Sequence, residues 1–427
     1  MIPLAEAQAY VLAGCPTLSP RQVGLAEAVG LVLAAPVVAP YPVPPFTTSS
    51  MDGYALRAAD VAGAPVELAV VDTVLAGAAP TRAVGPGEAI RIMTGAPLPP
   101  GADAVCMVER TAAADDGRSV VIEEAVGVGT AVRAAGGDVV AGQTVFSPGA
   151  VLTPGHVGVL ASLGVYEVDV QPSPSVGVLS TGDELVEGPG ELAPGKIRDA
   201  NRHSLLAILR RDGFAATDLG IVGDDPAAIA AAVTAGGAAC DALVTSGGVS
   251  VGDVDYVKTV LDELSGGAMR WMQVAIRPAK PQAFGNLAEG GTPVFGLPGN
   301  PVSVLVSYEL FVRPGLRKMA GHHELGRPKV LARAAEDLKR WPDDKLHLVR
   351  VVVDVDDDCR ATVRPHGAQE SHLLSGMAGA NGLALVPDGD GVLAGDEVEV
   401  LLLEAGELAP APVPFSMVGQ PARSGTR

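Results

Sequence analysis

Residues 244–257, VTSGGVSVGDVDYV, place hydroxyls, glycines and carboxylates directly after an apolar run. Gly247 and Gly248 would let the backbone approach a ligand closely and offer N–H groups to an anion. The hydroxyls of Ser246 and Ser250 would lie nearby, whereas Asp255 would repel an anion unless a cation lies between them. The stretch therefore predicts a site for an anionic ligand with a bridging cation.

Two further loops share this design. Residues 180–184, STGDE, and residues 297–301, LPGNP, each follow an apolar run and supply Glu184, Pro298 and Asn300. Because the carboxyl ends of parallel strands meet at one edge of a sheet, these loops should form one pocket with the loop after Ser246. One such loop alone is better explained as a tight turn, and the presence of three at equivalent positions favours a binding site. The phosphate-loop and dinucleotide-binding glycine patterns are both absent from the sequence.

Two cationic side chains stand between prolines in residues 277–281, RPAKP. Proline restricts the backbone, so Arg277 and Lys280 are presented with little entropy left to lose. Such a pair suits an oxyanion or a phosphate. The alternative is a solubilising turn, and the mostly apolar flanks favour the binding role.

Carboxylates beyond the expected strand ends could hold a magnesium ion. Glu184, Asp224 and Asp255 all occupy such places, and Mg²⁺ uses few carboxylates while keeping bound waters. The pair Asp224-Asp225 could equally cap a helix that starts at Pro226. Asp255 could likewise be an acid in the first turn of a helix, where the helix dipole favours it.

Two polar turns lie far from these loops in the sequence. MDGYAL (51–56) contains Asp52, and RIMTGAPLPPGADAV (91–105) contains Thr94. Aspartate-glycine and threonine-glycine pairs are typical of turns. Their spacing alone does not connect them with the pocket.

Strands and helices must position these residues. Apolar runs and helical patterns alternate over 175–320, which predicts a doubly wound, mainly parallel α/β domain. Short β segments over 50–145 predict a β-rich module, and those over 328–405 predict a small sheet or barrel. Helices are expected over 4–14 and 21–35, and the proline- and serine-rich tail after residue 408 is expected to be disordered.

Composition excludes several classes of protein. The 427 residues carry 30 basic and 49 acidic side chains, a net charge of −19, which argues against general binding to nucleic acid or anionic membranes. The four cysteines are far apart, so neither a zinc knuckle nor a disulfide framework is expected. The N-terminus lacks the pattern of a signal peptide, and no apolar run is long enough for a membrane span. We therefore expect a cytoplasmic protein.

Six motifs occur in an order that resembles a known family. PPFTTSSMDGYAL, RIMTGAPLPPGADAV, STGDEL, VTSGGVSVGDVDYV, AIRPAKP and GLPGNPVSV together are similar to molybdopterin molybdenumtransferases, the MoeA and gephyrin E-domain family. The resemblance extends over roughly residues 1–405. Any one motif is weak evidence, but six in series are specific.

The resemblance implies an activity and an assembly. Members of this family insert molybdenum from molybdate into adenylylated molybdopterin, release AMP and require Mg²⁺. Molybdenum is then captured by the pterin dithiolene sulfurs. The resemblance also implies a homodimer whose active site lies between subunits, with transient molybdopterin adenylyltransferase and molybdoenzyme partners.

The resemblance further implies a division into domains. An elongated linker domain would comprise residues 1–20 and 143–172, with a connector near 39–46. Residues 21–142 would form the β-rich insert, 173–321 the molybdopterin-binding α/β domain and 322–408 the C-terminal β-barrel. Residues 409–427 would form the disordered tail.

Functional positions of the family carry over to matching residues of this sequence. The acid and hydroxyl positions fall on Asp52 of DGYA, Thr94 of TGAP, Asp138 of Gly-Gly-Asp, Glu184 of GDEL, Asp224 and Asp255. The substrate-binding positions fall on Ser246, Gly247, Gly248, Ser250, Arg277, Lys280, Pro298, Asn300, Arg350 and Ser371. Glu184 and Asp255 would hold Mg²⁺, and Arg277 with Lys280 would attract molybdate.

Three departures from the family pattern matter. Thr47-Thr48 stands where the family has Asp-Asn, so a carboxylate is missing. Arg277 replaces a lysine, which keeps the charge and changes the geometry of binding. Ala279 replaces a glycine, a small change unless the backbone φ there is positive.

Three other functions compete with this one. A molybdopterin adenylyltransferase would resemble residues 175–320 but would need neither the insert nor the barrel. A non-catalytic scaffold like gephyrin would not need the acid-rich loops. A sugar- or nucleotide-binding α/β protein would leave the motifs near Asp52 and Thr94 unexplained.

Overall fold

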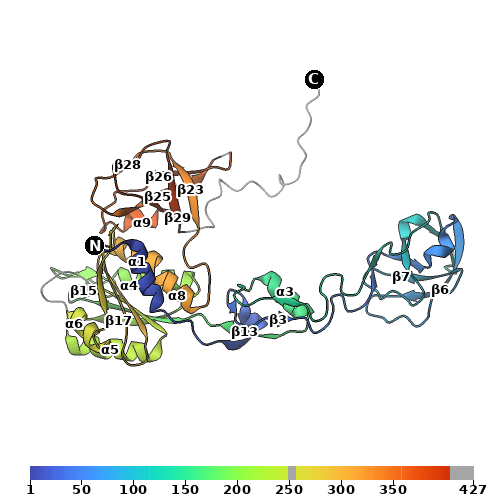
Figure 1. Cartoon of the computed structure of the whole chain (residues 1–427), viewed down its shortest axis with the longest axis horizontal. Helices are drawn as coiled ribbons and strands as arrows, with labels where there is room; N and C mark the ends of the chain where they lie inside the picture. Colours follow the sequence, from blue (N-terminus) through green and yellow to red (C-terminus); the bar gives the residue numbers. More distant parts are fainter. Residues whose placement is uncertain (115, 249–255, 357, 404–427) are drawn as a thin grey trace, which may run out of the picture. The chain divides into compact units, whose positions relative to one another are not determined.

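The computed structural model describes residues 1–114, 116–248, 256–356 and 358–403 of the 427. The chain divides into two compact units, one formed by Met1–Arg21 with Gln171–Arg427 and the other by Gln22–Val170. Figure 1 shows the elements of both units coloured along the sequence. Two expected site residues, Ser250 and Asp255, and the expected disordered tail at 409–427 lie outside the described residues.

The α/β domain of the first unit contains a six-stranded mixed sheet in the order β17-β14-β18-β22-β21-β19. Neighbours among the first four strands pair in parallel, whereas β21 runs antiparallel to both β22 and β19. The strands are β14 (Ser175–Thr181), β17 (Ala215–Val222), β18 (Ala242–Ser246), β19 (Arg270–Gln273), β21 (Pro281–Asn286) and β22 (Pro293–Leu297). The predicted fold class is confirmed for this domain.

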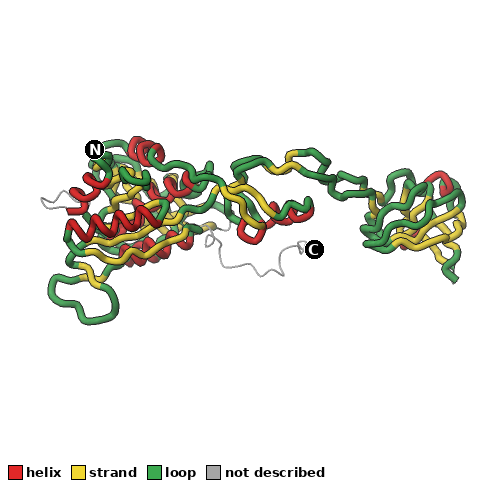
Figure 2. The backbone as a smooth tube through the Cα atoms, turned by 90° about the horizontal axis from the view of Figure 1, so that it is seen from below, coloured by secondary structure: helices red, strands yellow, loops and turns green. Residues whose placement is uncertain are grey.

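Helices cover both faces of this sheet (Figure 2). Along β18, Ala242 and Val244 belong to one apolar core and Leu243 to another, because successive side chains point to opposite faces. The first core includes residues of α1 (Leu4–Ala13), α4 (Asn201–Arg211), α7 (Pro301–Ser307), η3 (Tyr308–Val312) and α8 (Arg313–Met319). The second includes residues of α5 (Pro226–Ala239) and α6 (Tyr256–Leu264).

A closed barrel forms the C-terminal part of the same unit. Its strands follow the order β25-β26-β23-β29-β27, and β27 pairs again with β25. They are β23 (Lys329–Ala334), β25 (Leu346–Val355), β26 (Ala361–Pro365), β27 (Gly382–Val386) and β29 (Glu397–Leu402), in orange and red in Figure 1. The short strand β20 (Ile276–Arg277) leaves the α/β domain and pairs in parallel with β25, so the barrel is hydrogen-bonded to the segment that carries Arg277. The expected C-terminal β-barrel is therefore confirmed.

The second unit contains the expected β-rich module. Its six-stranded sheet follows the order β8-β5-β7-β6-β10-β9. The strands are β5 (Gly53–Leu56), β6 (Val66–Val74), β7 (Glu88–Ile92), β8 (Ala104–Met107), β9 (Thr111–Ala113) and β10 (Ser119–Ile122). Smaller pairings join β3 (Val37–Val38) with β12 (Thr144–Phe146) and β4 (Thr48–Ser49) with β11 (Val132–Arg133).

The helix expected over 21–35 is wrong. The structure has β1 (Arg21–Gly24), a single helical turn α2 (Leu25–Ala28) and β2 (Val32–Leu33). β1 and β2 flank β13 (Glu167–Gln171) in a three-stranded sheet, and α3 (Pro154–Ser162) lies nearby in the sequence. Gly30 has a φ of 86°, and β-branched valines favour strands, so the helical pattern of alanine and leucine does not prevail.

Across the part of the chain that the structure describes, none of the helices has both the length and the apolar character that a bilayer crossing requires.

Candidate functional site

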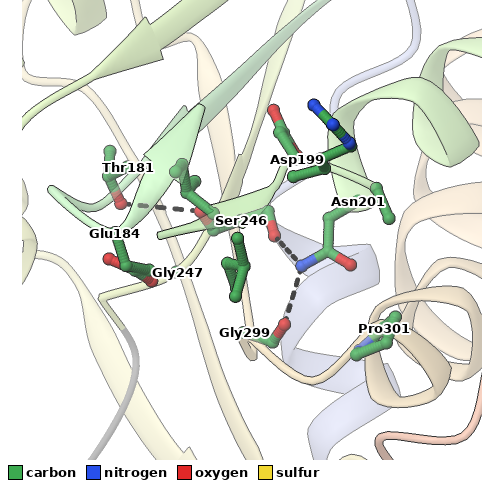
Figure 3. Close-up of a pocket in the computed structure, with 12 residues that line it drawn as sticks. Thr181, Glu184, Asp199, Asn201, Ser246, Gly247, Gly299 and Pro301 are labelled. Atoms are coloured by element: carbon green, nitrogen blue, oxygen red, sulfur yellow. Dashed lines mark hydrogen bonds between the residues drawn. The ribbon is translucent and has the colours of Figure 1, made fainter. Parts of the chain in front are cut away.

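The three polar loops meet at the carboxyl edge of the parallel strands. The ends of β14, β18 and β22 lie in register, with Ser180 opposite Ser246 and Ser246 opposite Leu297. A cavity of about 120 Å³ opens there (Figure 3). Its lining comprises Thr181, Glu184, Leu185, Ile197, Arg198, Asp199, Ala200, Asn201, Ser246, Gly247, Gly299 and Pro301. The structure thus places Glu184, Ser246 and Gly247 at one cavity, together with the loop that follows β22.

Glycine is required at both positions after Ser246, because other residues lie too close to the backbone there for a side chain. Gly247 has a φ of 102°, and a Cβ there would lie 2.7 Å from the Thr181 carbonyl oxygen. Gly248 has a φ of 68°, and a Cβ there would lie 2.3 Å from the Cβ of Val257. The Gly247 N–H donates to the Leu297 carbonyl at 3.2 Å. This amide is therefore engaged with the neighbouring strand, and the expectation that it serves an anion is not met in this structure.

Asn201, which the sequence analysis missed, connects two of the loops. Its side-chain Nδ2 donates to the Ser246 Oγ at 2.8 Å and to the Gly299 carbonyl oxygen at 2.7 Å (Figure 3). Asn201 is the first residue of α4, directly after the cavity-lining Asp199 and Ala200. The signal was present, because a helix start that carries polar side chains follows the strand and loop that supply Glu184.

The acid groups near the cavity fall into two kinds. Asp225 caps α5 and accepts the N–H groups of Ala227 and Ala228, both at 3.3 Å, which assigns the capping role to Asp225. The carboxylate of Asp224 instead accepts the Asp183 N–H at 3.4 Å, while the Asp224 N–H donates to the Asp183 Oδ1 at 3.1 Å. Asp224 does not line the cavity, but it bonds to the residue that precedes Glu184.

Gly182 lets Glu184 fold back over the end of β14. Gly182 has a φ of 140°, and a Cβ there would lie 2.3 Å from the Glu184 Oε2. Any larger residue would displace the carboxylate. The position of Glu184 in the cavity therefore depends on this glycine.

The cationic pair lies at a different cavity. Arg277 is exposed, with its Nη1 4.0 Å from the Asp343 carboxylate, and it lines a cavity of about 500 Å³ with barrel residues that include Arg340, Trp341 and His347. Lys280 is exposed and lines neither cavity. Ala279 between them has a φ of 72°, so the family's glycine is replaced where the backbone is left-handed.

Residues of the remaining substrate-binding positions support the loops and do not line the first cavity. Pro298 is buried and Asn300 is exposed at the start of α7. Arg350 is fully buried, and its guanidinium donates to the carbonyls of Ala368 and Glu370. Burial lowers the pKa of Arg350 from its usual value. The Ser371 carbonyl accepts the Val302 N–H at 3.1 Å, which holds the barrel loop against α7.

In the second unit, the structure brings Asp52 and Thr94 together across 42 residues. The Asp52 Oδ1 accepts both the backbone N–H and the hydroxyl of Thr94, each at 2.7 Å. These two hydrogen bonds, with a smaller contribution from Arg91, lower the pKa of Asp52, so the carboxylate is stabilised in its charged form. Asp52 precedes β5 and Thr94 follows β7, two paired strands of the same sheet.

Thr47 and Thr48, which differ from the family pattern, lie before the six-stranded sheet in the sequence, and Asp138 lies after it. The Asp138 N–H donates to the Val43 carbonyl at 3.0 Å and the side chain is exposed. The Thr47 Oγ1 accepts the Ala135 N–H at 3.3 Å, while Thr48 is buried in β4. Thr47 and Thr48 therefore help to pair the segment before this sheet with the segment after it.

Comparison with known proteins covers almost all of the chain. Residues 2–164 match a model described as "MoeA N-terminal region (domain I and II)", residues 177–318 match "Probable molybdopterin binding domain", and residues 332–403 match "MoeA C-terminal region (domain IV)". Molybdopterin molybdenumtransferase 2 of Mycobacterium tuberculosis is 40% identical over 390 residues, which cover 89% of this chain and 94% of the relative.

Two further relatives extend the likeness to sequence and structure. Molybdopterin molybdenumtransferase of Haemophilus influenzae is 35% identical over 403 residues, which cover 94% of this chain and 98% of the relative. The crystal structure of a molybdopterin biosynthesis MoeA protein from Pyrococcus horikoshii superimposes with a TM-score of 0.79 at 30% identity, covering 95% of this chain and 99% of that one. This chain belongs to the molybdopterin molybdenumtransferase (MoeA) family.

Proposed function

We propose that this chain transfers molybdenum from molybdate to adenylylated molybdopterin and releases AMP. The observation that carries the proposal is the cavity at the ends of β14, β18 and β22, because it brings a carboxylate, a hydroxyl and a glycine turn together within the molybdopterin-binding region. Ligands of doubly wound sheets bind at this edge. In this proposal the Ser246 hydroxyl contacts a phosphate oxygen, and Glu184 faces a cation bound to the phosphates; the support is that both residues line the cavity.

The Glu184 carboxylate at this cavity fits an Mg²⁺ ion held jointly with substrate phosphates. Mg²⁺ binds through one or two carboxylates and keeps several waters. Within the described ranges, no three His, Cys, Asp or Glu side chains are grouped to hold a metal on their own. We propose that Glu184 holds the ion, that Asp224 supports the Glu184 loop through its hydrogen bonds with Asp183, and that Asp255 is a further ligand. When bound, Mg²⁺ would offset the negative charge of the phosphates during cleavage of the phosphoanhydride.

We assign the capture of molybdate to Arg277 and Lys280. Both side chains are exposed, so they are accessible to an oxyanion. The guanidinium of Arg277 can bind two oxygens at once, whereas Lys280 offers a point charge. The nearby Asp343 carboxylate limits the local positive charge. Because salt screens the attraction between exposed charges, molybdate binding should weaken as the salt concentration rises.

Single-turnover conversion of adenylylated molybdopterin tests this function. Purified protein is mixed with substrate and Mg²⁺, with and without molybdate, and AMP and active cofactor are followed. Asp52→Ala and Glu184→Gln should both lose molybdate-dependent AMP release, and EDTA should abolish it in the unaltered protein. ATP-dependent adenylylation of molybdopterin would instead support an adenylyltransferase, and tight binding without turnover would support a scaffold.

Matched variants control for general effects on the fold. Asp72 is a comparable carboxylate on the same unit, because it accepts one backbone N–H, from Thr73 at 2.7 Å, and one threonine hydroxyl, from Thr81 at 2.8 Å. Asp72→Ala should leave AMP release unchanged. Glu399→Gln, which removes an exposed ion pair with Lys329 at 3.1 Å, serves the same purpose for Glu184→Gln.

We further propose a homodimer in which the second unit of one subunit completes the site of the other. The support is that each unit of the chain carries one polar cluster, Asp52 with Thr94 on the second unit and Glu184 with Ser246 on the first. Mixing inactive Asp52→Ala with inactive Glu184→Gln protein should then restore about one quarter of the sites, because half of the random dimers contain one intact site. A mixture that stays inactive while subunits exchange would show that each site lies within one chain.

We place this reaction in the cytoplasm. The support is that Cys15, Cys106, Cys240 and Cys359, which all lie among the described residues, are free thiols. Free cysteines are typical of a reducing compartment.

A further inference from the structure

The amide of Asn201 has only one orientation that satisfies its neighbours. The Gly299 carbonyl oxygen can only accept a hydrogen bond, so the atom 2.7 Å from it must be the nitrogen Nδ2. The same nitrogen lies 2.8 Å from the Ser246 Oγ and donates its second hydrogen there. One side chain therefore ties the turn after β18 to the turn after β22 (Figure 3).

This contact determines what the Ser246 hydroxyl can do. Its oxygen accepts from Asn201, so its own hydrogen must point to another acceptor. Ser246 is buried and lines the cavity, and within the described part of the chain its hydroxyl has no protein acceptor. A donor with no protein acceptor that faces a cavity is suited to an anionic oxygen of a ligand.

Asn201 is held in place by a buried ion pair. The Asp199 Oδ1 accepts the Arg202 N–H at 3.1 Å, and the Arg202 Nε donates to the Asp199 Oδ2 at 2.9 Å. Both side chains are almost completely buried. The pair flanks Asn201 on both sides in the sequence and fixes the first turn of α4, which holds the backbone of Asn201 in place.

We propose that Asn201 is a positioning residue that aims the Ser246 hydroxyl at a phosphate oxygen of the substrate. The identity of the ligand rests on the proposed function, whereas the role of Asn201 rests on its two hydrogen bonds. Asn201 need not touch the substrate to act. Its removal would leave the Ser246 hydroxyl free to rotate and to donate elsewhere.

A double-mutant cycle tests this role by equilibrium binding of adenylylated molybdopterin without molybdate, so that no turnover is needed. Asn201→Ala and Ser246→Ala should each weaken binding about tenfold, as expected for one lost hydrogen bond to a charged group. Because Asn201 acts through Ser246, the double variant should bind about as weakly as either single variant. Multiplication of the two losses, to about a hundredfold, would show independent roles and overturn the proposal.

Two further variants separate positioning from folding. Asn201→Asp keeps the size of the side chain but replaces the donor with an acceptor, so binding should be weakened at least as much as in Asn201→Ala. Ser204→Ala, three residues further along α4, should leave affinity unchanged. An Asn201→Ala variant that melts at a lower temperature but binds normally would refute the proposal. Failure of the proposed function would be seen separately, as absent AMP release in unaltered protein.

Discussion

Replacement of Arg327 by methionine should destabilise the first unit strongly, because two buried carboxylates depend on this guanidinium. The Arg327 Nη2 lies 2.7 Å from the Asp212 Oδ2, and its Nε lies 2.7 Å from the Glu309 Oε2. The side chains are 11%, 5% and 1% exposed respectively. Arg327 thus joins the segment before the barrel to the α4 end and to η3.

The expected magnitude follows from the partners that remain. Loss of one partner of a buried ion pair costs about 3–5 kcal/mol. Arg313 still contacts Asp212 at 3.1 Å and Arg211 still contacts Glu309 at 3.5 Å, so the lower end applies. We expect a loss of about 3 kcal/mol in the free energy of unfolding at pH 7, or roughly 1 M in the urea midpoint.

The loss should depend on pH in a defined direction. Burial alone would raise the pKa of Asp212, but Arg327 and the other donors lower it overall. A carboxyl group with a lowered folded-state pKa contributes stability above its unfolded value of about 3.9 and loses that contribution as the pH falls through the folded value. Without Arg327 the pKa of Asp212 rises, so the difference between the two proteins should narrow as the pH falls below about 4 towards the folded-state pKa of Asp212 in the unaltered protein.

Urea unfolding followed by circular dichroism and tryptophan fluorescence measures the effect. Arg364→Met is the matched control, because Arg364 pairs with Asp354 at 3.2 Å while both side chains are more than half exposed. That exposed pair should contribute less than about 1 kcal/mol. Equal losses for the two variants, or a difference that widens at low pH, would refute the reasoning.

Other predictions concern the two clusters and the strained turn. Thr94→Val should raise the pKa of Asp52 by removing a hydroxyl donor, which should move the acid limb of the pH profile for AMP release to higher pH. Gly182→Ala should displace Glu184 and raise the Mg²⁺ concentration needed for half-maximal activity several-fold. Ala279→Gly should be nearly neutral in thermal unfolding, since relief of about 1 kcal/mol offsets a lost buried methyl of about 0.8 kcal/mol. Ala279→Val should cost about 2 kcal/mol, because a β-branched residue is poorly accommodated there.

Controls for these predictions come from neighbouring positions. Thr94→Ser keeps the hydroxyl and should preserve the pH profile. Gly190→Ala should be silent in the Mg²⁺ titration, because a Cβ there would meet nothing within 4 Å. The argument for Gly182 would be contradicted if Gly182→Ala needed no more Mg²⁺ than the unaltered protein. The argument for Ala279 would be contradicted if Ala279→Val unfolded at the same temperature as the unaltered protein.

The sequence predicted the elements that depend on strong local patterns. The alternation of strand and helix over 175–320 predicted the doubly wound sheet, and the strand-end rule predicted that the loops at Glu184, Ser246 and Gly299 meet. Asn201 was missed because its role arises from two partners, 45 and 98 residues away. The hydrophobic periodicity of a sequence does not reveal contacts between polar residues so far apart along the chain.

Backbone conformation set a second limit on prediction. The engagement of the Gly247 N–H by Leu297 depends on the register of two strands. From the sequence, a positive φ at Ala279 could be named only as the circumstance in which replacement of glycine would matter. An alanine in the sequence does not indicate such a φ. The helix expected over 21–35 failed for a related reason, since pairing with β13 outweighs the local preference of alanine and leucine.

The first unit is built from two separated stretches of chain, and this affects how the protein is made. Ala7 and Val11 of α1 share a core with Leu316 and Met319 of α8, about 300 residues further along. At a synthesis rate of about 5–20 residues per second, α1 would wait roughly 15–60 s for this partner. Residues 22–170 form one continuous unit and can complete their own contacts within that time. The apolar side chains of α1 therefore gain their native packing partners only when nearly the whole first unit has been synthesised.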